Sequence, residues 1–152
     1  MSFLHELINS ITDDELKEQL HERVDLVKHK LLFTEKVPLA CLTATQQPQE
    51  ALDYLIGIAG GERVSDPGLA RVILYFEYKT GIPDLMQSAV PGLSDQWPAV
   101  RYNRVYLLDD TLALLREASD LVARLEDIAE MLHPGYFVFG NEGKTWISYN
   151  TL

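Results

Sequence analysis

The chain has 152 residues, of which 47% are hydrophobic, 24% charged and 9% aromatic. This is the composition of a folded domain, and a chain of this length buries about 68–70% of the surface that it exposes when unfolded. The net charge of −10 disfavours a nucleic-acid backbone or an anionic membrane as a partner. A single cysteine, Cys41, excludes an internal disulfide and a cysteine-based metal cluster.

The first residues show no pattern of an export or membrane segment. Residues 1–6 carry no basic stretch, and the apolar residues are interrupted by His5, Glu6 and Asn9. The longest apolar runs are a few residues, whereas about 18–20 are needed to span a bilayer. If the chain is complete, we expect a cytoplasmic protein that binds neither membrane nor nucleic acid.

Two helices are predicted at the N-terminus. The first is short and ends at Thr12, where Thr12 and Glu15 have the spacing of a capping box. The second is long and covers about residues 13–33. Its prediction depends on apolar residues at helical spacing, namely Leu16, Leu20, Val24, Val27 and Leu31.

Three short, almost entirely apolar runs predict strands covered on both faces, at residues 37–43, 72–76 and 104–108. A helix that begins at Pro48 and ends at Gly60 separates the first two strands. A weaker helix is predicted at 82–89, and Asn103, which tolerates a positive φ, precedes the third strand. The last long helix covers about 117–132.

The C-terminal tail differs in character. Two aromatic-rich runs, 136–139 and 145–149, flank a turn-forming stretch at 140–144, which is typical of a β-hairpin. Alternating strands and helices predict an α/β fold: a three-layer sandwich with a mostly parallel sheet, a long N-terminal helix and a C-terminal β-hairpin. We expect a single domain, made of a helical segment at 1–35, an α/β lobe at 36–134 and the hairpin tail at 135–152.

The glycine-rich stretches do not have the context of a nucleotide site. Residues 57–61 follow a helix, whereas a dinucleotide-binding loop follows a strand and opens a helix, so a helix C-cap is the better interpretation. Gly143-Lys144-Thr145 lacks the upstream glycine of a phosphate-binding loop. The four histidines are scattered along the sequence. We therefore predict no cofactor and no metal ion.

Catalytic motifs are also missing from the sequence. Cys41 lies inside an apolar strand, which predicts a core residue with an unactivated thiol. No Gly-x-Ser-x-Gly motif occurs, and no histidine lies near a candidate nucleophile. Glu77 and Asp109 are expected at the same edge of the sheet, where two acids are able to do acid–base chemistry. The preferred interpretation is nevertheless a protein that is not an enzyme.

Polar residues follow each predicted strand. The carboxyl ends of parallel strands meet at one edge of the sheet, where open α/β folds bind their ligands. The candidate ligand-binding residues at this edge are Thr43, Thr45, Glu77, Tyr78, Asp109 and Asp110. For the pair Asp109-Asp110, a solvated turn between strand and helix is the alternative.

Three segments, at residues 55–62, 97–106 and 125–134, resemble in this order the C-terminal lobe of the periplasmic substrate-binding proteins for cobalamin and iron-siderophore complexes. That family has a helix ending in Ala-Gly-Gly, a Trp-x-Ala-Val-x-x-Gly-Arg-Val-Tyr turn and a Leu-x-x-Leu-His-Pro helix. Asn103 stands here at the turn glycine. The resemblance covers about residues 13–137 and equates the helix at 13–33 with the helix that joins the two lobes.

The sequence also departs from that family. The resemblance includes no N-terminal lobe, and residues 43–47 lack the aromatic that packs on the ligand. The stretch after Glu62 is too short for the segment that docks on the permease, and the family's Arg-Pro-Gly-Pro-Arg is replaced by residues 116–120. The resemblance thus implies an inherited fold without the transport role.

The leading hypothesis is a non-catalytic single-lobe relative that binds a small molecule or a protein partner. The alternatives are a structural or interaction protein without a small ligand, and a substrate-binding subunit whose other lobe is a separate chain.

Trp97 is predicted to fill the core beside the third strand. A homodimer is predicted because apolar residues extend beyond one helix stripe, at Leu26, Leu32 and Phe33, and the tail is rich in aromatics. In the alternative, the hairpin packs on its own chain.

Overall fold

The computed structural model describes residues 3–42, 50–77, 79–109 and 117–149. In these ranges the α-helices are α1 (Phe3–Asn9), α2 (Asp14–Lys30), α3 (Glu50–Ile58), α4 (Ile82–Ala89), α5 (Pro98–Arg101) and α6 (Ala118–Leu132). The strands are β1 (Val37–Leu42), β2 (Gly61–Arg63), β3 (Val72–Phe76), β4 (Val105–Leu108) and β5 (Trp146–Tyr149). Two single turns of 3-10 helix lie at Pro67–Leu69 and Val90–Gly92.

The strands form one sheet in the order β2-β1-β3-β4-β5. The neighbours from β2 to β4 pair in parallel, and β5 pairs antiparallel with β4. The predicted mostly parallel sheet is therefore confirmed. The strand β2 was not predicted, because three residues of which two are exposed carry no hydrophobic pattern.

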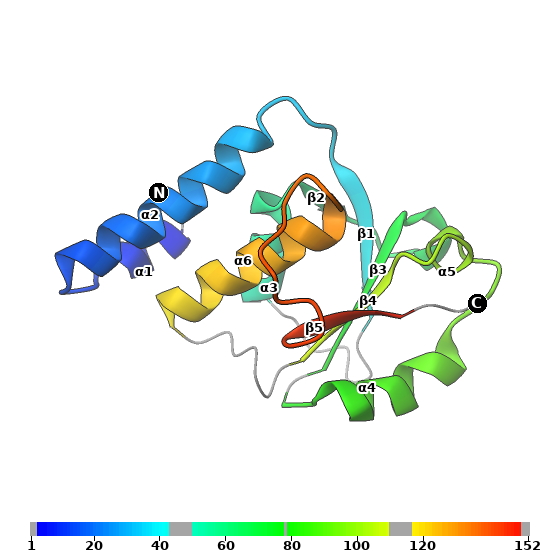
Figure 1. The fold of residues 1–152 in the computed structure, drawn as a ribbon. Coiled ribbons are helices and arrows are strands. Elements are labelled where there is room, and N and C mark those ends of the chain that lie inside the picture. Colours follow the sequence, from blue (N-terminus) through cyan, green and yellow to red (C-terminus); the bar gives the residue numbers. More distant parts are fainter. Residues whose placement is uncertain (1–2, 43–49, 78, 110–116, 150–152) are drawn as a thin grey trace.

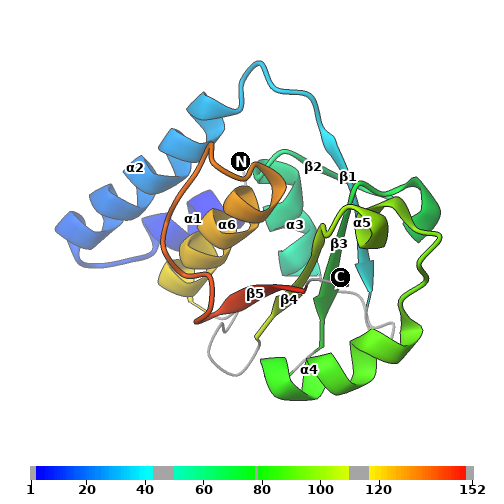
Figure 2. The ribbon, with the colours of Figure 1, turned by 45° about the vertical axis from the view of Figure 1, so that its right-hand side comes forward.

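Helices cover both faces of the sheet, which confirms the three-layer sandwich (Figure 1). The helices α3 and α6 lie on one face, with α1 and α2 outside them, and α4 and α5 lie on the other face (Figure 2). Successive strand residues point to opposite faces. In β3, for example, Leu74 and Phe76 join the core beside α3 and α6, whereas Ile73 joins the core beside α5 and Tyr75 packs with Leu85 of α4.

The long N-terminal helix is confirmed, although its ends differ from the prediction. It begins at Asp14, and the carboxylate of Asp13 accepts a hydrogen bond from the backbone N–H of Leu16 at 3.1 Å. Asp13 thus occupies the cap position that the capping-box interpretation gave to Thr12. The helix ends at Lys30 and packs its buried residues, among them Leu20 and Val27, against α6.

The C-terminal tail contains an antiparallel strand, but this strand pairs with β4 and not with residues 136–139. Leu108 is in register with Trp146, and Tyr106 with Ser148. Residues 136–139 are not a regular strand. The open side of β4 offers unpaired backbone groups, and β5 satisfies them at the edge of the sheet.

The segment between α6 and β5, residues 135–145, crosses α6 and is here called the C-terminal strap (Figure 2). Carboxylates of α6 hold it. Glu130 accepts a hydrogen bond from the backbone N–H of Phe139 at 2.6 Å, and Asp127 accepts one from Asn141 at 2.9 Å and one from Thr145 at 2.8 Å. Because these bonds tie the strap to a helix, it does not form the first strand of a hairpin.

The two tryptophans differ in burial from what the sequence suggested. Trp97 precedes α5 and is only half-buried against the smaller core on that face. Trp146 on β5 is 3% exposed and belongs to the main core beside α6. The side chain that fills the core is therefore Trp146, whose position depends on the path of the strap. No helix in the described ranges is both long enough and apolar enough to cross a membrane.

Candidate functional site

The carboxyl edge of the parallel sheet carries two of the predicted binding residues. Glu77 directly follows β3 and Asp109 directly follows β4. Phe76 and Leu108, the residues before them, are in register, so both acids leave neighbouring strands at the same level. Glu77 is half-buried, and Asp109 is 5% exposed. The structure thus brings two acids together at the edge where this class of fold binds ligands.

Asp109 also has a structural task at this edge. Its Oδ2 accepts a hydrogen bond from the backbone N–H of Ile82, the first residue of α4, at 3.3 Å. Its own backbone N–H donates to the carbonyl of Thr145 at 2.8 Å. The carboxylate therefore fixes the start of α4 beside β4. The simple solvated turn is not an adequate description of Asp109, since its side chain is buried.

The remaining predicted site residues lie outside the described residues. These are Thr43, Thr45, Tyr78 and Asp110. The described part of the edge therefore consists of the ends of β1, β3 and β4 and the first turn of α4.

Cys41 has the character that the sequence predicted. Burial raises the pKa of its thiol to about 12, which keeps it protonated at neutral pH and unreactive as a nucleophile. In the part of the chain that the structure describes, no three His, Cys, Asp or Glu side chains gather in a way that could hold a metal ion. The described edge thus offers hydrogen-bond acceptors without a nucleophile of its own.

A buried ionic cluster on α6 was missed by the sequence analysis. Asp127 is fully buried, and its Oδ2 lies 3.1 Å from Nε of Arg124, which is 6% exposed. Burial raises the pKa of Asp127, while Arg124 and the hydrogen bonds from Asn141 and Thr145 oppose that rise. The sequence contained one indication of this cluster, namely that charged residues lie in line with the apolar stripe of this helix. It anchors the strap to α6.

Two further residues, Glu130 and Glu142, were not among the candidates, although the structure places both at one pocket under the strap. The sequence offered a weak indication only, since each is an acid beside an aromatic or apolar stretch. Their approach depends on the path of the strap, which the hairpin prediction had wrong.

The three segments that carry the family resemblance meet at the amino end of the sheet. The ring Nε2 of His133 is 3.0 Å from the carbonyl oxygen of Ala59. Arg104 donates to the carbonyls of Met131 and Leu132 at 3.0 and 3.3 Å, which satisfies two orphan carbonyls at the end of α6. Asn103 adopts the predicted positive φ, at 57°. The motifs therefore join α3, β4 and α6 at this end of the sheet.

Replacing Gly60 with alanine is expected to destabilise this junction. Gly60 has a φ of +86°, and an added Cβ would lie 2.9 Å from Nε2 of His133. The left-handed conformation alone costs about 1–2 kcal/mol with a side chain. Chemical denaturation measures the loss, and Gly57→Ala, where a Cβ meets nothing within 4 Å, is the matched control. Equal effects of the two substitutions would contradict the proposed crowding.

A pH dependence of stability is expected from His133. Burial, aided by the nearby Arg104, lowers the pKa of its imidazole below the ordinary 6.5, and the bond to the Ala59 carbonyl opposes this only in part. The unfolded chain then binds more protons, so this contribution is complete above pH 6.5 and is lost as the pH falls through that value. Between about pH 7.5 and about pH 5.5, the free energy of unfolding in urea should decrease less for His133→Gln than for the wild-type chain. An unchanged decrease would assign the dependence to other groups.

No protein-family model matches the chain, and no curated protein matches it in sequence. Solved structures do match. An ABC transporter substrate-binding protein from Listeria monocytogenes has a TM-score of 0.60 at 19% identity, over 86% of this chain and 62% of that one. The TroA-like periplasmic binding protein FepB from Veillonella parvula has a TM-score of 0.63 at 15% identity, over 88% and 52%. IsdE of S. aureus, solved with heme, has a TM-score of 0.57 at 14% identity, over 86% and 62%.

These likenesses correct one prediction and confirm another. Proteins with this fold are named as periplasmic binding proteins, which contradicts the cytoplasmic location expected from the first residues of the chain. The chain spans between 52% and 62% of the length of these three structures. The resemblance that the three motifs carried is confirmed at the level of the fold, and the chain has the architecture of a single lobe of a TroA-like periplasmic binding protein.

Proposed function

We propose that the chain is a single-domain, non-catalytic binding module that takes a small molecule at the carboxyl edge of its sheet. The observation that carries this proposal is the placement of Glu77 and Asp109 at the same level on β3 and β4. The structural neighbours are named as binding proteins, and one of them was solved with heme. Metal-chelate complexes are therefore the first ligand class to test.

The chemistry of the edge is compatible with such a ligand. Carboxylates accept hydrogen bonds from the polar groups of a ligand, and they bind donors more strongly than neutral acceptors do. Glu77 is the residue chosen for the test, because its side chain is half-buried and reaches solvent more than that of Asp109, which is 5% exposed. A non-enzymatic role is supported by the protonated Cys41 thiol at neutral pH and by the naming of the structural neighbours.

The test is a thermal-shift and absorbance titration of the chain with heme, a ferric siderophore and a corrinoid. We expect one class to raise the melting temperature by several degrees and Glu77→Gln to reduce that shift. Glu62→Gln is the control, because Glu62 is an exposed acid of β2 paired at the amino end of the sheet. A shift that both variants retain would contradict the site, and silence across the whole panel would contradict the function.

Two alternatives are distinguished by the same titration. A structural or interaction protein would show no response to any of the three ligand classes. A substrate-binding subunit whose other lobe is a separate chain would respond only after that chain is added. The second alternative is supported by the coverage, since the chain spans 52–62% of the three binding proteins that it matches.

The homodimer remains a prediction, and fewer apolar side chains are available for its interface than the sequence suggested. Phe137 and Trp146 are buried in their own chain, which removes them from the aromatic patch expected on the tail. Large apolar side chains remain exposed around the end of α2, with Leu26 at 51%, Leu32 at 62% and Phe33 at 98%. Light scattering at micromolar concentration should give twice 17.2 kDa, and Phe33→Ser should lower the mass toward that of one chain. A wild-type mass near 17.2 kDa rules the dimer out.

A further inference from the structure

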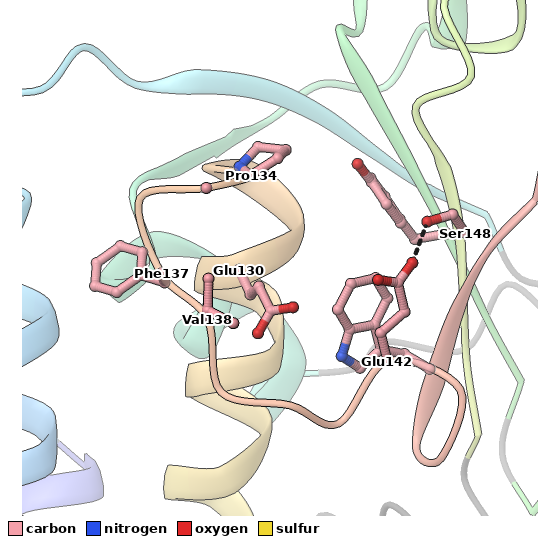
Figure 3. A pocket seen from close by; sticks show the side chains of 9 residues that line it. Glu130, Pro134, Phe137, Val138, Glu142 and Ser148 are labelled. Carbon is pink, nitrogen blue, oxygen red and sulfur yellow. Dashed lines mark hydrogen bonds between the residues drawn. The ribbon is translucent and has the colours of Figure 1, made fainter.

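A pocket lies away from the carboxyl edge, between the end of α6, the strap and β5 (Figure 3). It has a volume of about 390 Å³, which is within the range of pockets that hold small molecules. Its lining includes Tyr106 of β4 and Ser148 of β5, which are paired across the sheet on the side of the amino end of β4. It is therefore distinct from the edge occupied by Glu77 and Asp109.

Two carboxylates face this pocket from different segments, Glu130 from α6 and Glu142 from the strap (Figure 3). Each is oriented by a single hydrogen bond to its Oε1. The backbone N–H of Phe139 donates to Glu130 at 2.6 Å, and the hydroxyl of Ser148 donates to Glu142 at 2.7 Å. Among the described residues no donor binds the second oxygen of either carboxylate, so two oriented acceptors remain for a ligand.

No lysine, arginine or histidine is among the lining residues that the structure describes. Two cations contact lining residues: Nε of Arg104 donates to the hydroxyl of Tyr106 at 2.9 Å, and Nζ of Lys30 lies 4.7 Å from the centroid of the Phe137 ring. Both also donate to backbone carbonyls, Arg104 to those at the end of α6 and Lys30 to that of Tyr136. The chain as a whole has a net charge of −10. Anionic ligands are therefore disfavoured here.

The remaining lining is aromatic and apolar. The rings of Tyr106 and Trp146 meet edge to face with centroids 5.6 Å apart, and Phe137 lines the pocket from the strap. Trp146 lines the pocket as well, and its Nε1 is shielded from solvent and finds no acceptor in the described chain. Aromatic rings attract organic cations and also pack against their methylene groups.

We infer that this pocket binds an organic cation, an alkylammonium compound of small size. The ammonium group pairs with Glu130 and Glu142, and its carbon chain packs against Pro134 and Val138, which are the exposed apolar residues of the lining. This combination of oriented carboxylates and apolar surface separates the pocket from an ordinary acidic patch, which has no apolar cavity beside it. The inference does not depend on the function proposed for the carboxyl edge.

The probe is 1,6-diaminohexane, and the readout is the fluorescence of Trp146. The chain has two tryptophans, so Trp97→Phe leaves Trp146 as the single reporter. We expect a saturable change in this background. Glu142→Gln and Glu130→Gln should each weaken binding by about ten-fold, as expected for the loss of a hydrogen bond to a charged group. Both amides keep an oxygen that accepts the bond from Ser148 or Phe139.

Two controls separate this site from other effects. Hexane-1,6-diol and adipate, which match the probe in length without its positive charges, should produce no saturable change. Glu62→Gln and Glu77→Gln should leave the affinity for the diamine unchanged, since neither residue lines the pocket. A linear response, an equal response to the diol, or full affinity in Glu142→Gln with an unchanged melting temperature would overturn the inference.

Discussion

Replacing Asp127 with alanine is expected to destabilise the protein by about 3–5 kcal/mol, because it leaves a buried arginine without its partner. Asp127 is fully buried, and Arg124, one helical turn before it, is 6% exposed. The substitution also removes the acceptor for Asn141 and Thr145, which hold the strap to α6. Urea denaturation followed by circular dichroism measures the loss.

The matched control for Asp127 is Asp14→Ala. Asp14 and Lys17 form an ion pair with the same spacing of three residues on a helix, but the Asp14 side chain is 98% exposed. Exposed pairs contribute about 0–1 kcal/mol, so this substitution should have little effect. Limited proteolysis should cleave Asp127→Ala within residues 135–145 before the rest of the chain. Similar stabilities of the two variants would show that the buried pair does not anchor the strap.

Replacing Trp146 with alanine is expected to cost about 3–5 kcal/mol, the usual loss for a large aromatic removed from a core. Trp146 is 3% exposed and contacts Tyr106 within the main core. Trp97→Ala should cost less, because Trp97 is only partly buried and packs against the smaller core. Chemical denaturation of both variants under the same conditions compares them.

A third variant tests the same site by another route. Trp146→Phe removes an indole N–H that has no acceptor in the described chain, and it keeps most of the ring. Since an unsatisfied buried donor carries a desolvation cost, this substitution should lose much less stability than Trp146→Ala. A larger loss for Trp97→Ala than for Trp146→Ala would reverse the order of burial and contradict the position of β5 in the sheet.

The elements of the α/β lobe were predictable because their patterns are local. The run of apolar residues at 72–76 reads as a strand covered on both faces, and β3 occupies those residues. Asn103 was expected to adopt a positive φ, and it does so at 57°. The three motifs that gave the family resemblance are local as well. Each has the residues that a helix end or a tight turn requires at that place.

The cap of α2 and the strand β2 could not be predicted from local pattern. Thr12 and Asp13 are both good cap residues, and the choice between them depends on how the chain enters from α1. β2 has three residues and exists because β1 offers it an unpaired edge. In both cases the sequence permits several structures, and contacts with distant residues select one of them.

The candidate site was also predictable only in part. The alternation of strands and helices predicted that Glu77 and Asp109 follow adjacent strands, because it brings the carboxyl ends of parallel strands to one edge. That Asp109 also fixes the start of α4, through the N–H of Ile82, depends on the position of that helix in space. The pocket beside Glu130 and Glu142 could not be foreseen, since its lining comes from β4, α6, the strap and β5 together.

The sequence by itself determined the class of fold, the main helices and strands, and the inert character of Cys41, because hydrophobic period and turn chemistry act over a few residues. Only the tertiary structure decided the path of the tail. Residues 136–149 have the composition of a hairpin, yet β4 offers an unpaired edge to β5, and Asp127 and Glu130 on α6 offer acceptors to the strap. β4 and α6 are distant from the tail in sequence, so the tail can pair with them only when the sheet and α6 have come together. Local sequence patterns do not contain these contacts.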